Sequence, residues 1–555
     1  MKNDSTSFPR IELGDGPESN YEFANESSVT RGDILRRGAG IGAGLVAAGA
    51  VPGLALGKAK PKKKKPPAQP KPSGNFVLAT DGTPTGMDLD PLGGTQGGEV
   101  NIALREMFFE RLTKVSPSGK ILPWLATAFS SNADATVWKI KLREGVVWHD
   151  GGHFSADDVV WSLKYILNTP GVSATATLQS FLAGPQSIQK LDSLTVQLNL
   201  SGPLVFLPQI FSELRLFIVR DGQSGPFNPP VGTGPFVFSN WTQGQQITGT
   251  RNPHYWQHGK PYVDQFQIQL ISDPTARYNA LQSGQVHALA QLPPGLLNTV
   301  KGNSNVKLLA HGGGAFGALA MRSDIAPFND NRVRMAMKLL VNRPQMLGTA
   351  MAGAGNIAND VQNALDPDRA TLKEIPQHKY DPDQAKSLLA AAGVPNLNIP
   401  LTACPTIGDY STQIATVFSQ QAQSASNISV PLDVVTSAVY QGSRYKVSPF
   451  VTVFWSARYL DEYISQSLIP GGGTQETNWS DPSFTSLWQQ YRGTQNDAKR
   501  HDLAIQLQKT MWSTGPYVIP CVEDLIDCYS SKVAGINSGV IRNFNLYDFR
   551  TAHFV

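Results

Sequence analysis

Apolar and polar positions along residues 75–555 alternate in some stretches and recur at helical spacing in others. Residues 136–151, "TVWKIKLREGVVWHDG", alternate between apolar and polar side chains and then reach Asp150-Gly151, a pair typical of tight turns. Because a period of two is the mark of a half-buried strand, this segment predicts a strand, a turn and a second strand.

A helix is expected directly afterwards, over residues 154–168. Ser155 is suited to cap its first turn, and Asp158 follows three residues later, which predicts a capping box with Asp in place of the usual Glu or Gln. The apolar residues that share one face of this helix are Val159, Leu163 and Ile166.

Two further segments predict helices with defined ends. In residues 380–393, Asp381 is suited to the N-cap, Pro382 to the first helical position and Gly393 to a left-handed stop. Residues 329–343 predict another helix. Its expected buried face consists of Val333, Ala336, Met337 and Leu340.

Strands and helices alternate through the rest of the chain, separated by turns such as "GTGPF" (232–236) and "RNPHYW" (251–256). No Pro/Ser-rich linker divides residues 75–555. The pattern therefore predicts a mixed α/β protein whose domains are interleaved, with the chain crossing between them more than once.

Composition and charge narrow the classes of function. The 555 residues are enough for two to four domains, and 41% hydrophobic residues allow a large core. The net charge of +4 comes from residues 58–72, which carry seven Lys, so the remaining body is close to neutral and nucleic-acid binding is not expected. The Lys/Pro stretch is either a solvated spacer or a segment that touches an anionic surface.

Residues 1–57 resemble an export signal. Basic "TRGDILRR" (30–37) precedes an uncharged stretch from Gly38 to Leu56 that ends in small residues suited to signal peptidase. Gly32 stands where the second arginine of a twin-arginine motif belongs, so twin-arginine and general secretory export both remain open. The Gly/Ala-rich stretch favours a cleaved signal, although its length also allows a retained membrane anchor.

Reactive chemistry has little support. "HDGGH" (149–153) is either a metal-site fragment or a turn demanded by backbone geometry. Cys404, Cys521 and Cys528 form no zinc pattern, and the last two are either a small disulfide loop or two free thiols. The Gly-rich stretches match neither a phosphate-binding loop nor a nucleophile elbow, which favours a binding protein over an enzyme.

Several stretches together resemble one family, the family 5 extracellular solute-binding proteins of ABC importers for peptides, opines and nickel. The resembling stretches, in order, are "LDP" (89–91), "MFFERL" (107–112), "LREGVVWHDGGHFSADDVVWSL" (142–163), "GTGPF" (232–236), "RNPHYW" (251–256), "LQSGQVHAL" (281–289), "APFNDNRVRMAMKLLVNR" (326–343), "YDPDQAKSLLAAAG" (380–393), the "W-x-A" segment (455–457) and "NWSDPSFTSLW" (478–488). Each stretch is a weak signal by itself, and their common order makes the resemblance specific.

The resemblance implies an α/β fold of two lobes that close over a solute in a cleft, as in periplasmic binding proteins, with a small extra domain inserted in the first lobe. The expected segments are the export signal (1–57), the spacer (58–72), the first lobe (73–105, 230–311 and 516–555), the extra domain (106–229) and the second lobe (312–515). Crossings near 311 and 515 would form the hinge.

The resemblance also implies a binding site around "WSARYLDEY" (455–463). Peptide-binding members carry an Asp for the peptide amine where this chain has Arg458, so the reversed charge favours a ligand with an acidic end. The alternative is a shifted loop in which Arg458 faces solvent and Asp461 takes the amine. The expected ligand-binding residues are Trp455, Arg458, Tyr459, Asn478, Thr95 and Gln96.

The implied function is that of a monomeric, non-enzymatic substrate-binding component of an ABC importer. It would need no cofactor, would capture a peptide-like solute or an acidic conjugate such as an opine, and would act with permease and ATPase subunits in the periplasm or on the outer face of the cytoplasmic membrane. Oligopeptide or metal-complex binding by the same fold, and a sensor or chaperone module without its own transporter, remain alternatives.

Overall fold

The structure is a computed structural model of the whole chain. It describes residues 10–11, 70–81, 89–92, 98–170, 172, 174–225, 227–361, 366, 368–408, 410–425, 427–539 and 543–555. Residues 71–555 belong to one compact unit. The expected export signal and spacer lie outside the described residues except for 10–11 and 70–72. Within the described part, no helix has both the length and the apolar character needed to cross a membrane.

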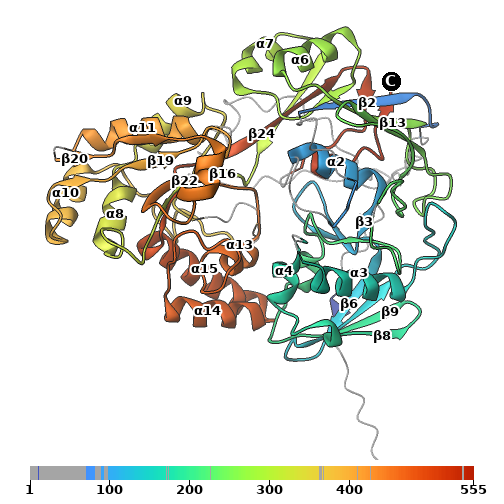
Figure 1. The fold of residues 1–555 in the computed structure, drawn as a ribbon, viewed down its shortest axis with the longest axis horizontal. Coiled ribbons are helices and arrows are strands. Elements are labelled where there is room, and N and C mark those ends of the chain that lie inside the picture. Colours follow the sequence, from blue (N-terminus) through green and yellow to red (C-terminus); the bar gives the residue numbers. More distant parts are fainter. Residues whose placement is uncertain are drawn as a thin grey trace, which may run out of the picture. The chain divides into compact units, whose positions relative to one another are not determined.

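The largest sheet has eight strands and is buried on both faces at its centre. In order they are β11 (Phe236–Thr242), β12 (Gln246–Arg251), β13 (Gln265–Leu270), β2 (Asn75–Thr80), β14 (Ala288–Leu289), β24 (Cys521–Ser530) and β15 (Val306–Gly312), with β17 (Gly355–Ile357) also paired to β24. Side chains of β2 alternate between two cores, one shared with α2 (Gly98–Phe108) and the other with α6 (Pro274–Ser283), which lie on opposite sides of β2 in Figure 1.

The part of the chain between α2 and β11 contributes four strands to an antiparallel five-stranded sheet. Its order is β1 (Arg10–Ile11), β6 (Ala126–Ser131), β7 (Val137–Leu142), β9 (Thr195–Asn199) and β8 (Ile188–Asp192). Helix α3 (Ala156–Asn168) packs against β8 and β9, with Ser155 and Asp158 forming the expected capping box. The three residues predicted for the inner face, Val159, Leu163 and Ile166, are all buried.

The second strand predicted within 136–151 is absent. After β7 the chain makes a single bridge, between Val147 and His153, in place of a strand. Gly145 and Gly151 adopt φ of 77° and 89°, conformations that only glycine takes without strain, so the backbone turns twice within seven residues. The turn at Asp150-Gly151 itself is confirmed.

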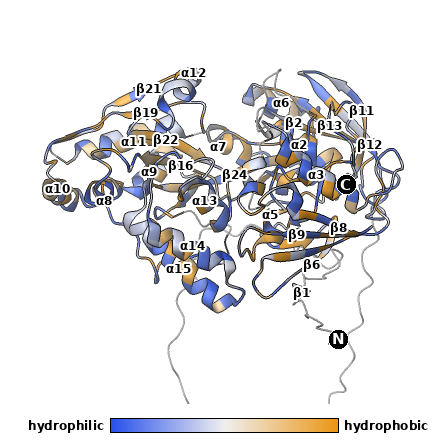
Figure 2. Cartoon of the chain, turned by 60° about the horizontal axis from the view of Figure 1, so that its bottom comes forward, coloured by the Kyte–Doolittle hydropathy of each residue, from blue (hydrophilic) through white to orange (hydrophobic). Residues whose placement is uncertain are grey.

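A second five-stranded sheet is formed by strands between Phe316 and Val518. Its order is β21 (Leu432–Val434), β19 (Leu401–Ala403), β22 (Phe450–Trp455), β16 (Phe316–Met321) and β23 (Tyr517–Val518). One face packs on α8 (Asn331–Leu339), α9 (Arg343–Ala350), α10 (Pro382–Ala391) and α11 (Ser411–Gln423). The other face packs on α13 (Leu460–Ser467), α14 (Pro482–Gly493) and α15 (Asp497–Thr514). Hydrophobic and hydrophilic residues mix along α14 and α15, as Figure 2 shows, which suits helices with one buried side.

The predicted helix ends in this part are confirmed. Asp381 caps α10 by accepting from the N–H of Gln384, Pro382 begins the helix, and Gly393 follows its end with φ of 78°. Helix α8 covers the middle of the segment 329–343. All four residues of its predicted face, Val333, Ala336, Met337 and Leu340, are fully buried.

The remaining described elements are short. They are β3 (Glu110–Arg111), β4 (Thr113–Val115), β5 (Ile121–Pro123), α4 (Thr175–Gln179), η2 (Pro185–Ser187), α5 (Leu207–Ile210), β10 (Phe217–Ile218), η3 (Pro294–Leu296), α7 (Leu297–Lys301), β18 (Leu397–Asn398), β20 (Ile428–Ser429), α12 (Ser437–Val439), η4 (Tyr440–Arg444), β25 (Val533–Ala534), α16 (Phe544–Tyr547) and β26 (His553–Phe554).

Two short crossings join the eight-stranded sheet and the second five-stranded sheet. The chain leaves β15 at Gly312 and enters β16 at Phe316, and it returns from β23 at Val518 to β24 at Cys521. Interleaving is therefore achieved by strand-to-strand crossings of two or three residues. This explains why no linker is visible in the sequence.

The cysteines are free and buried. Cys521 and Cys528 lie on the same strand, β24, and Cys404 follows β19. At about 3.3 Å per residue, a seven-residue separation along a strand is far beyond the reach of a disulfide. Of the two alternatives, the structure selects free thiols.

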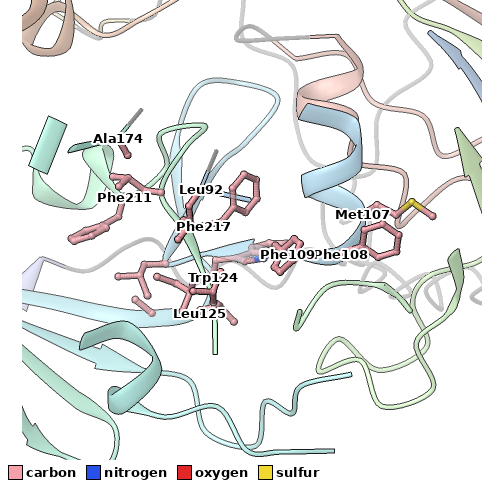
Figure 3. Packing of buried hydrophobic residues seen from close by; sticks show 14 of the residues in the cluster. Leu92, Met107, Phe108, Phe109, Trp124, Leu125, Ala174, Phe211 and Phe217 are labelled. Atoms are coloured by element: carbon pink, nitrogen blue, oxygen red, sulfur yellow. The ribbon is translucent and has the colours of Figure 1, made fainter. Parts of the chain in front are cut away.

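Three motifs that are far apart in sequence meet at one buried carboxylate. Glu110 accepts hydrogen bonds from Trp124 Nε1 at 2.7 Å, from Thr233 Oγ1 at 2.9 Å and from the Tyr255 hydroxyl at 2.8 Å. Burial raises the pKa of Glu110, and these donors oppose the shift. Figure 3 shows Trp124 together with Phe108 and Phe109 in the surrounding hydrophobic cluster. "MFFERL", "GTGPF" and "RNPHYW" thus share a structural role.

Candidate solute-binding site

The segment 455–459 leaves the end of β22 and leads into α13. β19 runs parallel to both β21 and β22, so the carboxyl ends of the three strands lie at one edge of the sheet. At that edge Trp455 is paired with Phe316, the first residue of β16 after the crossing from the eight-stranded sheet. Loops at the carboxyl ends of parallel strands are the usual position of ligands in open α/β sheets.

Trp455 is held by a fixed set of contacts. Its indole N–H donates to Glu476 Oε1 at 2.8 Å, and its ring makes an edge-on contact with Tyr463, with 5.0 Å between ring centroids. Only 3% of the residue is exposed, so the indole is part of the core that underlies the edge. Its expected role as a wall of the site stays a prediction.

Glu476 is a buried acid with aromatic donors on two sides. Besides Trp455, the hydroxyl of Tyr445 donates to it, at 3.0 Å. Burial raises the pKa of Glu476 to about 7, and the hydrogen bonds from Trp455 and Tyr445 oppose that rise. The carboxyl group directly behind the 455–459 segment therefore titrates near neutral pH.

Arg458 has a carboxylate partner within the chain. Its Nε lies 3.1 Å from Glu462 Oε1, one helical turn further on, and its guanidinium carbon lies 4.9 Å from the centre of the Trp455 ring. The two side chains are 19% and 21% exposed, so both remain partly accessible to solvent. The arginine is neither fully solvated nor isolated, because Glu462 is its ion-pair partner. Its expected role as a clamp for an anionic group of the ligand stays a prediction.

Asp461, the acid expected to replace the missing aspartate if the loop were shifted, faces the interior. It is paired with Arg492 at 3.0 Å and accepts from Trp488 Nε1 at 2.8 Å. The partly exposed acid at this end of α13 is Glu462.

Tyr459 connects the segment to the part of the chain around β4 and β5. Its hydroxyl donates to the carbonyl of Gly119 at 3.2 Å, and Ile121 packs against Tyr459 and Ala457. The contact joins residues 340 positions apart in sequence. Tyr459 thus lies where two parts of the chain that are far apart in sequence meet.

Two hollows adjoin these residues and share Glu462. The smaller is about 40 Å³. It is lined by Gln209, Ser212, Glu213, Leu214, Ser456, Ala457, Arg458, Tyr459 and Glu462. The larger is about 460 Å³ and is bordered by α4, Arg215, the outer face of α13 and the glycine-rich loop 470–474.

A second charged pair lies beside the first. Arg215 Nε is 2.5 Å from Glu213 Oε1. Burial lowers the pKa of Arg215, while the carboxylates of Glu213 and Glu462 raise it and prevail. Burial raises the pKa of Glu462 to about 7; Arg458 opposes this rise and Glu213 adds to it. The four charged groups therefore act on one another.

The other predicted site residues are not brought to this place by any observed contact. Asn478 is exposed, has φ of 49° and donates its amide to Asp324 Oδ2 at 3.0 Å. It borders neither of the two hollows. Thr95 and Gln96 lie outside the described residues.

The turn "HDGGH" has a structural explanation. The backbone N–H of Gly232 donates to His149 Nδ1 at 3.2 Å, and His149 Nε2 lies 3.0 Å from the carbonyl oxygen of Gly234. Burial lowers the pKa of His149 to about 4. The structure, where it describes the chain, contains no group of three or more His, Cys, Asp or Glu side chains placed to hold a metal ion.

Sequence reasoning missed two residues of this region. Glu462 stands four residues after Arg458, and this spacing brings side chains together only across a helical turn, which the sequence analysis did not predict here. Glu476 gives no local signal, because its partner Trp455 is 21 residues away.

The architecture is that of the two-lobed periplasmic binding proteins. It superimposes with a TM-score of 0.73 on the structure of a periplasmic binding protein from A. tumefacien R10 in complex with agropinic acid, at 24% identity, covering 87% of this chain and 99% of that one. It also resembles an ABC transporter-associated periplasmic binding protein from Helicobacter pylori in complex with the peptide STSA, with a TM-score of 0.72, 21% identity and coverage of 87% and 98%.

Residues 120–476 match the sequence model of bacterial extracellular solute-binding proteins, family 5. The chain belongs to this family of solute-binding proteins. It is 27% identical over 477 residues to di/tripeptide-binding protein 1 of Pseudomonas aeruginosa (strain UCBPP-PA14), covering 78% of this chain and 86% of the relative. It is 24% identical over 454 residues to a glutathione-binding protein of Escherichia coli (strain K12), with the same coverage.

Proposed function

We propose that this solute-binding protein captures a small solute at the sheet edge formed by 455–462 and delivers it to the permease of an ABC importer. The observation that carries the proposal is the position of this segment. It follows the carboxyl ends of parallel strands and adjoins two hollows, one of which is large enough for a dipeptide-sized molecule. Membership of a solute-binding family supports the same conclusion.

Capture would occur by closure of two lobes. The first lobe would comprise 73–105, 230–311 and 516–555, with 106–229 as the extra domain, and the second lobe 312–515. The short crossings between Gly312 and Phe316 and between Val518 and Cys521 support a hinge at these positions, because few backbone torsions would have to change. Solute contacts with both lobes would shift the population toward the closed form.

The solute would be peptide-like or an acidic conjugate such as an opine. Arg458 supports a ligand that carries a carboxylate, and relatives named for binding di- and tripeptides and glutathione support a peptide-like body. Trp455 and Tyr459 would supply aromatic surface, and Asn478, Thr95 and Gln96 would complete the site. No bond would be made or broken, and ATP would be used by partner subunits.

Two other functions would use the same fold. One is binding of longer peptides or metal complexes. The other is a sensor or chaperone module without a dedicated transporter. In each case we expect a monomer that acts outside the cytoplasmic membrane after export.

Mass spectrometry of small molecules that co-purify with the protein tests the proposal. A single bound solute should appear, and adding it back should raise the melting temperature and reduce the radius of gyration in solution scattering. Conversion of that solute to a product by the purified protein would replace transport with catalysis as the function.

A further inference from the structure

Four charged side chains lie at the two hollows, as two ion pairs. Arg458 and Glu462 form one pair at 3.1 Å, and Glu213 and Arg215 form the other at 2.5 Å. Glu213, Arg458 and Glu462 border the small hollow, and Arg215 and Glu462 border the large one. The first pair belongs to the 455–463 segment and the second to the segment that precedes β10.

The balance of charge decides which ligands the cluster can favour. When both carboxyl groups are ionised, two guanidinium groups and two carboxylates sum to no net charge. A purely anionic group near Arg458 would then also meet the carboxylates of Glu462 and Glu213. A purely cationic group near Glu462 would likewise meet Arg458. A ligand whose own charges alternate over a short distance gains from both pairs.

We propose that Arg458 and Glu462 together recognise a zwitterionic head group, in which an ammonium and a carboxylate are attached to one carbon atom. This rests on the solute-binding function proposed above. The ligand carboxylate lies against Arg458 and the ligand ammonium against Glu462. The second pair borders the same two hollows, Glu213 the small one and Arg215 the large one. Arg458 thus contributes to ligand selectivity only together with Glu462.

The sizes of the two hollows fit this assignment. A volume of about 40 Å³ has room for a small charged group and not for a peptide body. The adjoining hollow of about 460 Å³ shares Glu462 and offers polar side chains such as Thr177, Gln179 and Gln466 for the remainder of the ligand. A γ-linked amino acid, whose free amine and carboxylate stay on one carbon, has this division into head and body.

Three probes that differ only in the head group test the proposal. S-methylglutathione carries both charges, its glutaryl analogue lacks the ammonium, and its 4-aminobutyryl analogue lacks the head carboxylate. Titration calorimetry with the wild-type protein should give at least tenfold tighter binding of the intact probe than of either analogue.

Two variants assign each charge to its partner. In Arg458→Gln the preference for the probe with a head carboxylate should disappear, while the preference for the ammonium persists. In Glu462→Gln the reverse should hold. The matched controls are Lys386→Gln and Asp383→Asn, which remove the charges of another intrahelical pair, on α10, and should leave all three affinities unchanged.

The proposal is overturned if either single-charge analogue binds the wild type as tightly as S-methylglutathione, or if both variants weaken all three probes equally. It is also overturned if none of the probes binds at millimolar concentration. In that event binding of trialanine would leave solute capture intact and remove only the zwitterion site, whereas the absence of any bound solute in mass spectrometry would remove both.

Discussion

Trp455 and Glu476 are joined by a 2.8 Å hydrogen bond between an indole N–H and a buried carboxyl oxygen. The bond ties the last residue of β22 to a loop 21 residues further along the chain. Because Arg458 lies over the same indole ring, the position of the charged pair at the site depends on this buried acid.

The acid gives the stability of the protein a defined pH dependence. The pKa of Glu476 is about 7 in the folded protein and near 4.5 when the chain is unfolded, so between these values the folded state holds a proton that the unfolded state has released. The protonated Glu476 therefore adds its full contribution to the free energy of unfolding below about pH 4.5, and this contribution is lost as the pH rises through 7. It amounts to about 3 kcal/mol.

Glu476→Gln should abolish that dependence. In urea denaturation, the free energy of unfolding of the wild type should fall relative to the variant by about 3 kcal/mol between pH 5 and 8.5. Asp383→Asn, which changes an exposed carboxylate, should follow the wild-type curve. Parallel curves for the wild type and Glu476→Gln would show that the acid ionises normally.

A second prediction concerns the buried pair Arg343–Asp360. Arg343 Nη2 lies 2.6 Å from Asp360 Oδ2, and Asp360 Oδ1 accepts from the N–H of Ile519 in the crossing to β24. Arg343→Met should lower the free energy of unfolding by roughly 3–5 kcal/mol, because the fully buried Asp360 carboxylate loses its guanidinium partner and keeps only His378 and the Ile519 N–H. Lys386→Met, on the exposed face of α10, should change it by less than about 0.5 kcal/mol. If Arg343→Met and Lys386→Met changed the free energy of unfolding equally in chemical denaturation, the stabilising role of the Arg343–Asp360 pair would be contradicted.

The N-cap of α3 allows a graded test. Ser155→Ala removes one side-chain acceptor and should cost about 1 kcal/mol of stability. Asp158→Asn should cost more, about 2 kcal/mol, because Asp158 accepts from the N–H groups of both Ser155 and Asp221 and an amide nitrogen cannot accept. The reverse order in thermal unfolding would mean that the two bonds to Asp158 contribute little.

Two substitutions at Tyr459 test its structural contact and its expected ligand contact separately. Tyr459→Phe removes the hydrogen bond to Gly119 and should lower stability by about 1 kcal/mol while leaving solute affinity within a few-fold. Tyr459→Ala also removes the ring, so affinity for the co-purified solute should fall at least tenfold. An unchanged dissociation constant in Tyr459→Ala would place the ring outside the site.

Local chemistry was readable from the sequence, and long-range pairing was not. Ser155 and Asp381 predict helix starts because a cap acts on residues two or three positions away. Glu110 meets Thr233 across 123 residues and Tyr255 across 145, so no window of sequence shows why these motifs occur together.

In the candidate site too, local features were predicted from the sequence and long-range contacts were not. The sequence predicts Arg458 as its central charge, and the i,i+4 spacing to Glu462 becomes informative only once α13 is known to begin at Leu460. Glu213 and Arg215 reach this place through the tertiary fold alone. An isolated arginine was therefore expected where the structure has a compensated pair.

The three unpaired, buried cysteines have a consequence for how the protein matures. Burial raises the pKa of the Cys521 and Cys528 thiols to about 12, so they stay protonated and unreactive once the chain has folded. Reaching the native state requires no oxidant and no disulfide isomerase. The same fold can form in a reducing compartment or in an oxidising one, and its stability is independent of the redox poise of either.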